Sequence, residues 1–423
     1  MKEDFIEFIW KHQYFLKDNL QTSNGDSLQI VKVGEKNINA GPDFFNAQIV
    51  VNGQKWAGNV ELHVNSSDWY VHGHENDTNY DNVILHVVWV DDAPIFRKDN
   101  SLFTCLELSQ CVDQTLLTNY REIFSAKQKW IPCESKIRSI DPFLLNSWLE
   151  RLYFERLEQK SGFILDLLKK SNNDWEAVLF QLLAKNFGLK VNGDAFFIMA
   201  KNLNFSILRK EATLDNHLEA LFFGQAGLLQ DENENEYYHL LKDQYKHQLN
   251  KYNLTKMNVV QVEYFRLRPN NFPTIRIAQL ASLYERHQNL FSKIIEIKNL
   301  NAYYKLFDVS ASSYWDTHYT FKAKSSKRSK RLTKSFIDLL LINTVIPIKF
   351  IYQKSIGRPD HKEILALMEA ITSEKNSIVE KFKELGVHSD SAFSSQSLLQ
   401  LKNEYCKKHA CLNCQIGAKL LQD

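Results

Sequence analysis

The chain has 423 residues, enough for two or three domains. Hydrophobic residues make up 44% and charged residues 24%, a globular balance, and no uncharged apolar run reaches the length of about 18 residues that spans a membrane. The 52 Lys and Arg residues stand against 50 Asp and Glu residues, which excludes a uniformly cationic surface but allows a local basic groove. Acids interrupt the apolar pattern of the first 15 residues, so we expect no secretory signal. These features predict a soluble, cytoplasmic protein of several domains with no membrane partner.

The first 90 residues predict a helix followed by strands. Apolar residues at helical spacing predict a helix over residues 3–13. Apolar and alternating runs predict strands over residues 27–34, 45–51, 56–64 and 83–90. The dipeptide Asn52-Gly53 separates the second and third of these strands and is a strong signal for a tight hairpin. The polar residues 65–82 predict a connector before the last strand.

The apolar pattern becomes helical from about residue 139. It continues through residues 141–168, 175–187, 217–223, 236–252 and 275–297. The apolar stretch 336–351 contains polar residues and predicts a buried core element. We therefore expect an α+β protein with a mixed-sheet α/β domain at 1–138, a mostly α-helical domain at 139–405 and a cysteine-bearing tail at 406–423.

Three polar residues of the predicted hairpin could act together. Glu61 and His63 are two residues apart in one strand, so their side chains share a face. The tight turn returns the region after Asp43 toward Glu61. Two converging carboxylates can hold Mg²⁺ or Mn²⁺, which prefer oxygen ligands. Beside the metal, His63 could position or deprotonate the attacking water, and we expect the neighbouring carboxylates to raise its pKa.

The order of helix, three strands, connector and strand around Pro42-Asp43 and Glu61-Leu62-His63 resembles the PD-(D/E)xK nuclease superfamily. This resemblance implies a restriction-endonuclease-like domain that cleaves phosphodiesters with Mg²⁺ or Mn²⁺ at Asp43 and Glu61, with Glu7 on the first helix as an accessory acid. His63 stands where the superfamily has lysine. The whole chain also resembles an uncharacterised bacterial domain-of-unknown-function family, in the stretches GPDFFNAQI, WAGNVELHV, SSDWYVHGHENDTNYDNVILHVV, RLRPNNFP and CLNCQIG.

The connector carries a second polar group, His72 and His74, followed by Asp77 and Tyr80. If the connector covers the carboxylates, His72 or His74 could contact the scissile phosphate, while Asp77 and Tyr80 fix its path. Alternatively, these imidazoles could join His63 and His86 as ligands of a zinc ion.

Three cysteines crowd the C-terminus as Cys406-x4-Cys411-x2-Cys414, a spacing that is typical of metal ligands. The fourth ligand would be Cys133, with His409 as the alternative. A shared zinc ion requires the sulfurs to lie within about 4 Å of one another. Some nucleases of the resembled superfamily hold an iron–sulfur cluster with one early and three late cysteines, so Zn²⁺ and [4Fe–4S] both stay open. Cys105 and Cys111 are expected in the core.

Residues 322–334 form a serine-spaced basic run that predicts a flexible loop. Its charges could neutralise phosphates of a nucleic acid, with aromatic residues 314–319 as stacking faces and Arg276 on the same surface. The predicted nucleic-acid-binding residues are Lys322, Lys324, Lys327, Arg328, Lys330, Arg331, Lys334, Arg266 and Arg268.

Three functions follow from these residues. The first is a metal-dependent nuclease-like protein that acts on or binds nucleic acid. The second is a catalytically inactive nuclease-fold scaffold that binds protein or nucleic acid, with His63 marking the loss of catalysis. The third is a zinc hydrolase that uses the histidine cluster.

Overall fold

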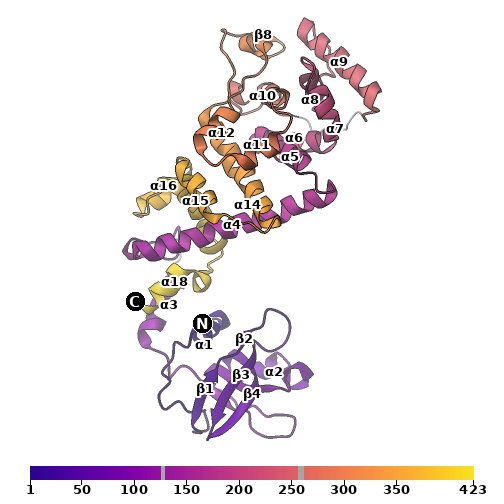
Figure 1. The fold of residues 1–423 in the computed structure, drawn as a ribbon. Coiled ribbons are helices and arrows are strands. Elements are labelled where there is room, and N and C mark those ends of the chain that lie inside the picture. Colours follow the sequence, from indigo (N-terminus) through magenta and orange to yellow (C-terminus); the bar gives the residue numbers. More distant parts are fainter. Residues whose placement is uncertain (125–128, 256–261) are drawn as a thin grey trace. The chain divides into compact units, whose positions relative to one another are not determined.

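A computed structural model of the chain describes residues 1–124, 129–255 and 262–423. Its contacts divide the protein into two compact units. Unit 1 comprises Met1–Trp148, Glu384–Val387 and Leu401–Asp423, and unit 2 comprises Leu149–Lys383 and His388–Gln400. Unit 1 thus includes the cysteine tail. The predicted α+β class is confirmed: unit 1 contains a mixed sheet, and unit 2 is mostly helical (Figure 1).

Unit 1 is built on a six-stranded sheet with the order β1-β3-β4-β5-β6, in which β2 pairs with β3. Its strands are β1 (Leu28–Lys32), β2 (Glu35–Lys36), β3 (Phe44–Val51), β4 (Gln54–Asn65), β5 (Val83–Val90) and β6 (Cys105–Glu107). Its helices are α1 (Glu3–His12), α2 (Asp68–Val71), α3 (Gln114–Phe124) and α18 (Gln415–Gln422). β1, β3 and β4 are antiparallel, whereas β5 and β6 continue the sheet in parallel.

The predicted hairpin at Asn52-Gly53 is confirmed. Both residues have positive φ, at 47° and 85°, and they join β3 to β4 in antiparallel register. The parallel step from β4 to β5 needs a crossover, which the short helix α2 and two 3₁₀ turns provide. This crossover is the predicted polar connector. Apolar residues of α1 pack into the core of unit 1, where Phe5 stacks on Tyr120 of α3 at 3.8 Å between ring centroids.

Unit 2 is helical because its apolar residues recur at helical spacing and pack into one large core. Its elements are most of α4 (Pro142–Lys170), α5 (Trp175–Phe187), α6 (Leu189–Lys201), α7 (Phe205–Glu211), α8 (His217–Gln225), α9 (Glu236–Tyr252), α10 (Pro273–Arg286), α11 (Leu290–Glu296), α12 (Leu300–Leu306), β7 (His318–Thr320), β8 (Ala323–Lys324), α13 (Lys334–Leu340), α14 (Ile346–Ser355), α15 (His361–Ala370), α16 (Ser377–Glu384) and α17 (Ala392–Gln400). The predicted helix 275–297 is interrupted at His287, between α10 and α11.

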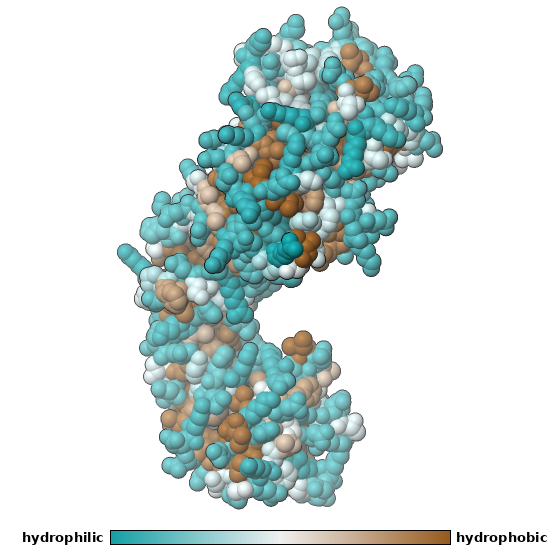
Figure 2. Space-filling model, in the orientation of Figure 1, coloured by the Kyte–Doolittle hydropathy of each residue, from teal (hydrophilic) through white to brown (hydrophobic). Residues whose placement is uncertain are grey.

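One helical stretch, Lys334–Ser355, is long and apolar enough to cross a membrane, but 72% of its most apolar window is buried in unit 2. It contains a π-helical turn, Leu341–Val345, between α13 and α14. The predicted core element at 336–351 is therefore confirmed. Figure 2 shows hydrophilic residues over most of the face drawn. The protein is globular in the part of the chain that the structure describes.

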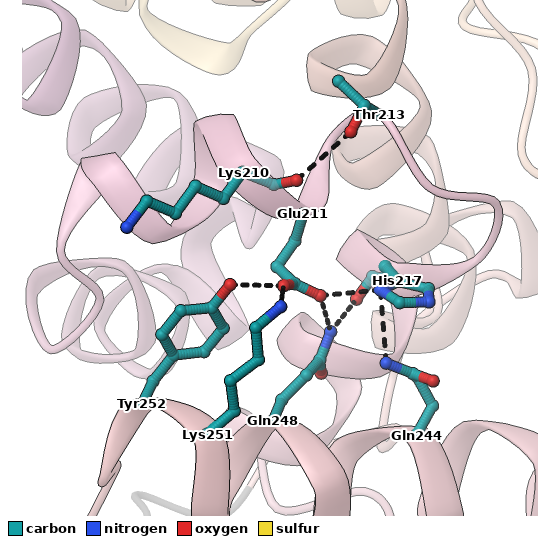
Figure 3. A network of polar contacts seen from close by, with 8 residues as sticks. All are labelled: Lys210, Glu211, Thr213, His217, Gln244, Gln248, Lys251 and Tyr252. Carbon is teal, nitrogen blue, oxygen red and sulfur yellow. Dashed lines mark hydrogen bonds and ion pairs between the residues drawn. The ribbon is translucent and has the colours of Figure 1, made fainter.

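A buried carboxylate ties α7, α8 and α9 together in unit 2 (Figure 3). Glu211 accepts hydrogen bonds from His217 Nδ1 at 2.6 Å and Gln248 Nε2 at 2.8 Å. It also accepts from Lys251 Nζ at 2.9 Å and the Tyr252 hydroxyl at 2.5 Å. Burial alone would raise the pKa of Glu211, but the donors outweigh burial and lower it to about 2. We call this group the Glu211 network.

Candidate metal centre

Three polar residues of β4 and β5 lie on one face of the sheet in unit 1. Glu61 and His63 are both buried and project together from β4, as their spacing predicts. His86 of β5 is paired in register with Glu61. Its Nε2 atom lies 2.8 Å from Nδ1 of His63, which fixes the orientation of the His63 ring and leaves His63 Nε2 facing the other way.

Asp43 lies beside Glu61. It immediately precedes β3, and the pairing of Phe44 with Val60 brings it next to the Glu61 segment. The Asp43 backbone N–H donates to Glu61 Oε2 at 3.1 Å, and Asp43 Oδ2 accepts from the Leu62 backbone at 3.0 Å. Burial and then the negative charge of Glu61 raise the pKa of Asp43 to about 7.

The connector brings two further imidazoles to this point. His72 ends α2, His74 begins the following 3₁₀ turn, and Gly73 between them has a φ of 73°. His72 Nδ1 lies 3.0 Å from His63 Nε2. One ligand atom from each of His63, His72 and His74 lies within 4.8 Å of the other two.

Glu61 borders this group, because its Oε1 lies 3.3 Å from His74 Nε2 and 3.6 Å from His63 Nε2. His74 Nε2 is buried and makes no hydrogen bond with the residues that the structure describes. Because no hydrogen bond joins His74 Nε2 to Glu61 Oε1, the lone pairs of both atoms can point toward one metal ion. We call Glu61, His63, His72 and His74 together the histidine site.

These separations match those of ligands on one metal ion. Zinc lies about 2.0–2.1 Å from an imidazole nitrogen, so two such nitrogens bound to one ion are separated by roughly 3 Å. His63 Nε2 and His72 Nδ1 have this separation. His72 is exposed, which leaves one side of the group open to solvent. A metal site with an open position suits catalysis better than a closed structural site.

Aromatic side chains hold the connector in place. Tyr80 stacks on the His74 ring with 3.8 Å between centroids. Trp69 is buried and meets the rings of His74 and His86 at 5.4 Å and 5.3 Å. Asp77 caps the second 3₁₀ turn by accepting from the Asn79 backbone. Burial and then the nearby Glu61 charge raise the pKa of Tyr80 to about 12, so its hydroxyl stays protonated.

The expectation that carboxylates raise the pKa of His63 is wrong. Burial, followed by the neighbouring imidazoles of His86, His74 and His72, lowers this pKa to about 2. Burial also lowers the pKa of His86, to about 3. Both rings are therefore neutral in ordinary buffers, and neutral imidazole is the form that binds metal.

Two acids of α1 face this region. Glu7, the predicted accessory acid, pairs with Lys36 at 2.5 Å, and its charge helps raise the pKa of Asp43. Glu3 was not among the predicted site residues. Burial raises the pKa of Glu3, and Glu3 is close enough to the site for the charge of His72 to lower this pKa and that of Glu61 to raise it. The signal was present in the sequence, because Glu3 and Glu7 are four residues apart and share a helix face.

A cavity of about 360 Å³ lies next to α1 in unit 1. Asp4 and Glu7 of α1 line it, but no residue of the histidine site does. Four lysines also line it, namely Lys2, Lys11, Lys36 and Lys408. Lys36 is paired with Glu7, and the other three lysines outnumber the remaining acid, Asp4, so the lining carries an excess of positive charge that favours an anionic group.

The basic run in unit 2 is only partly a free surface. Lys322, Lys324, Lys327, Arg328, Lys334, Arg266 and Arg268 are exposed. By contrast, Lys330 is buried over the Tyr319 ring and donates to the Asp316 and Arg328 carbonyls. Arg331 forms an ion pair with Asp308. The run also begins in a short β7–β8 hairpin, so the expectation of a loop throughout is wrong.

Three other predicted contacts of the basic surface are wrong. Trp315 is fully buried and donates from Nε1 to Glu219 at 2.5 Å. His318 is also buried and stacks on Tyr314. Arg276 is buried, where it donates to Gln279 and Asn271. These residues are buried in unit 2 and bind partners inside it, although Arg276 Nε has no hydrogen-bond partner among the described residues.

The cysteines of the tail meet Cys133 inside unit 1. The charges of Cys133, Cys411 and Cys414 all act on the Cys406 thiol. His409, the alternative fourth ligand, is exposed and lines the lysine cavity. Cys105 is buried in β6, as expected, and Cys111 is half-buried.

The fold defines an α+β protein in which histidines of the mixed sheet and of its crossover connector lie close together. The chain matches a family described as a protein of unknown function (DUF2851) over residues 3–377, and it belongs to that family. No curated protein matches the chain, and no solved structure does.

Proposed function

We propose that unit 1 is a metal-dependent phosphodiesterase of the nuclease type, with its ion held at the histidine site. The observation that carries this proposal is the grouping of three imidazoles within 4.8 Å, with Glu61 next to two of them and Asp43 beside Glu61. Imidazole favours transition metals such as zinc, whereas Mg²⁺ prefers oxygen ligands. We therefore propose a transition-metal ion, with Mn²⁺ as a substitute, in place of the Mg²⁺ that two carboxylates alone would favour.

The side chains around the site can carry out hydrolysis. A bound ion would polarise the phosphoryl oxygen and lower the pKa of a bound water. Asp43 is the best candidate for the general base, because its pKa of about 7 in the metal-free site is close to neutral pH. His86 would position the His63 ring through their 2.8 Å contact. Glu3 and Glu7 would add negative charge that attracts the cation.

Two observations support a phosphodiester as the substrate. The strand order, with Asp43 before β3 and Glu61 within β4, fits the proposed likeness to PD-(D/E)xK nucleases. The lysine-lined cavity of the same unit contains Glu7, the proposed accessory acid, and its four lysines could bind a phosphate of the substrate. In unit 2, the exposed residues Lys322, Lys324, Lys327 and Arg328 would add affinity for nucleic acid. We place this activity in the cytoplasm.

The test is metal content together with hydrolysis by the purified full-length chain. Substrates are single- and double-stranded DNA and RNA and an aryl phosphodiester, each with Mg²⁺, Mn²⁺ or Zn²⁺. We expect metal-dependent cleavage of a nucleic acid that His72→Ala abolishes, since His72 is an exposed ligand whose removal leaves the core intact. The matched control is His388→Ala, an exposed histidine of unit 2.

The alternative functions predict different results. Cleavage of the aryl phosphodiester alone would favour a zinc hydrolase with a small substrate. Metal binding without hydrolysis of any substrate would favour the inactive scaffold. Absence of metal binding at the histidine site would contradict the proposal altogether.

The contribution of unit 2 is tested separately by nucleic-acid affinity. Removing the Lys322 and Lys324 charges should weaken binding to all sequences and reduce the salt dependence by about one counterion per lysine. Lys354→Ala, an exposed lysine of the same unit, serves as control. Unchanged affinity in the double variant would show that the basic run takes no part in binding.

A further inference from the structure

The C-terminal tail folds back onto the segment that follows α3 in unit 1. α18 packs beside α3 (Figure 1), and Asn119 Nδ2 of α3 donates to the Leu421 carbonyl at 3.2 Å. The Lys402 ammonium donates to the Trp130 carbonyl and lies 4.3 Å from the centre of the Trp130 ring. The two hydrogen bonds join residues 302 and 272 positions apart in sequence. They also bring Cys133, which lies three residues after Trp130, to the tail cysteines.

The four thiols form one cluster. The charges of Cys133, Cys411 and Cys414 act on Cys406. The charges of Cys133 and Cys414 also act on Cys411. Cys406, Cys411 and Cys414 are buried and Cys133 is half-buried. All six cysteines lie in the described ranges and are free thiols. The charge of Lys402 acts on Cys406 and the charge of Lys129 acts on Cys133.

The backbone around the tail cysteines is shaped to hold sulfur ligands. Cys411 begins a 3₁₀ turn, and Cys414 is the N-cap of α18. Burial raises the pKa of the Cys414 thiol, and the backbone N–H groups of Gly417 and Ile416, which donate to its sulfur, oppose that rise. A Cβ at Gly417 would lie 2.2 Å from the Cys411 carbonyl oxygen, so only glycine allows this close turn.

We propose that Cys133, Cys406, Cys411 and Cys414 bind a metal centre through four thiolates. The centre would join the end of α3 to the C-terminal tail and so stabilise unit 1. Its chemical class is a zinc ion or an iron–sulfur cluster, the two centres that four cysteines commonly hold. It is separate from the histidine site and does not depend on the proposed hydrolysis.

The spacing of the sulfurs favours the larger centre. Among the residues that the structure describes, only His63, His72 and His74 form a group of three or more ligand residues whose ligand atoms all lie within 4.8 Å of one another. The four sulfurs are spaced more widely than that. The expectation of about 4 Å, which assumed one zinc ion, is therefore wrong for this arrangement, since zinc would need the sulfurs about 3.8 Å apart. A polynuclear iron–sulfur cluster spans a wider set of ligands.

The test is the metal content of the full-length chain, purified without oxygen and without chelator. Iron, acid-labile sulfide and zinc are measured together with the visible absorption spectrum. We expect one centre per chain, as iron with sulfide. Zinc in place of iron would equally support four-thiolate ligation and identify the metal.

Variants locate the centre. Cys411→Ser should reduce the content of this metal to near zero, while Cys111→Ser, a change at a half-buried cysteine outside the cluster, should leave it unchanged. His72→Ala should also leave it unchanged, which separates this centre from the histidine site. Equal metal content in wild type and Cys411→Ser would overturn the proposal.

Thiol reactivity provides a second measurement on the unmodified sequence, in case the serine variant does not fold. Cys133 and Cys111 are both half-buried. We expect an alkylating reagent to modify Cys111 in the native protein but Cys133 only after the metal is removed. Alkylation of Cys133 at the same rate before and after chelation would overturn the proposal.

Discussion

The histidine site in unit 1 and the Glu211 network in unit 2 both surround a buried carboxylate, but they supply opposite kinds of neighbours. Glu211 receives four hydrogen-bond donors on its two oxygens, and its pKa falls to about 2. Glu61 instead has a second carboxylate, Asp43, beside it, and the pKa of Asp43 rises to about 7. Donors of the protein satisfy both oxygens of Glu211, whereas the histidine site has more hydrogen-bond acceptors than donors.

This difference separates a structural cluster from a site that is built for a ligand. Buried polar groups are normally satisfied, and each exception requires an explanation. His86 Nδ1 and His74 Nε2 are buried without a hydrogen-bond partner among the described residues. A cation at the histidine site would neutralise Glu61 and give His74 Nε2 a partner. Nothing comparable is needed at Glu211.

The sharpest test of this comparison is the same carboxylate-to-amide change at both places. Glu211→Gln should lower the free energy of unfolding of unit 2 by about 1–3 kcal/mol, because the amide has one acceptor oxygen in place of two and leaves donors such as the buried Gln248 without a partner. Glu61→Gln should not destabilise metal-free unit 1, because it removes repulsion with Asp43, but it should weaken metal binding at least about 10-fold. Urea unfolding and metal titration measure the two effects.

Glu234→Ala, a change at an exposed glutamate, is the control for the first variant. If Glu61→Gln destabilised the metal-free protein as much as Glu211→Gln does, the two clusters would have the same structural role. The proposed distinction between them would then be lost.

Acid should destabilise unit 1 through its buried histidines. The folded-state pKa values of His63 and His86, about 2 and about 3, lie below the unfolded value of 6.5. Between about pH 6 and pH 4 the unfolded chain binds protons that the folded chain does not, so stability falls as pH falls, by up to about 1.4 kcal/mol per pH unit for each histidine.

Hydrogen exchange of the β4–β5 peptides, measured on metal-free protein as a function of pH, follows this loss. His86→Asn should make the dependence shallower, because it removes one of the two histidines. His388→Ala should leave it as steep as in the wild type. The same steepness in His86→Asn and wild type would show that His86 does not stay neutral when folded.

Much of the sheet could be predicted from the sequence, because its signals are local. The Asn52-Gly53 turn and the alternation of residues 56–64 suffice to place Glu61 and His63 on one face. By contrast, the meeting of His72 with His63 depends on the crossover path and on Gly73, which periodicity does not describe. The cluster of Cys133 with the tail depends on contacts between segments 272 residues apart.

The exposure of charged residues was the least predictable feature. Lys330 and Lys327 stand three positions apart in one basic run, but the first is buried over Tyr319 and the second is exposed. The difference comes from carbonyl acceptors at Asp316 and Arg328 that the fold places next to Lys330. A run of charges gives no information about such acceptors.

Asp43→Asn should change the pH dependence of metal-free unit 1 in the direction opposite to a histidine variant. The folded-state pKa of Asp43, about 7, lies above the unfolded value of 3.8. Between about pH 4 and pH 7 the folded chain keeps a proton that the unfolded chain has lost, so this group lowers stability as pH rises, by up to about 1.4 kcal/mol per pH unit. Asp43→Asn should remove that decline, measured by hydrogen exchange of the β3–β4 peptides. Asp18→Asn, at an exposed acid of unit 1, should not.

The smallest expected effect is at Gly73, and it tests whether the connector is shaped for metal binding. Gly73 has a φ of 73°, and the position that a Cβ would occupy there is open space. Gly73→Ala therefore meets backbone strain without a clash and should cost about 1 kcal/mol of unfolding free energy. Gly53 in the β3–β4 turn has the same features, with a φ of 85°, and Gly53→Ala should cost about the same.

The two glycines differ in their neighbours, because Gly73 lies between the metal-site residues His72 and His74 whereas Gly53 lies in a turn away from them. Metal affinity should therefore fall in Gly73→Ala and stay unchanged in Gly53→Ala, although thermal unfolding shifts equally in both. Equal metal affinity in the two variants would mean that the connector reaches the histidine site without help from the left-handed backbone at Gly73.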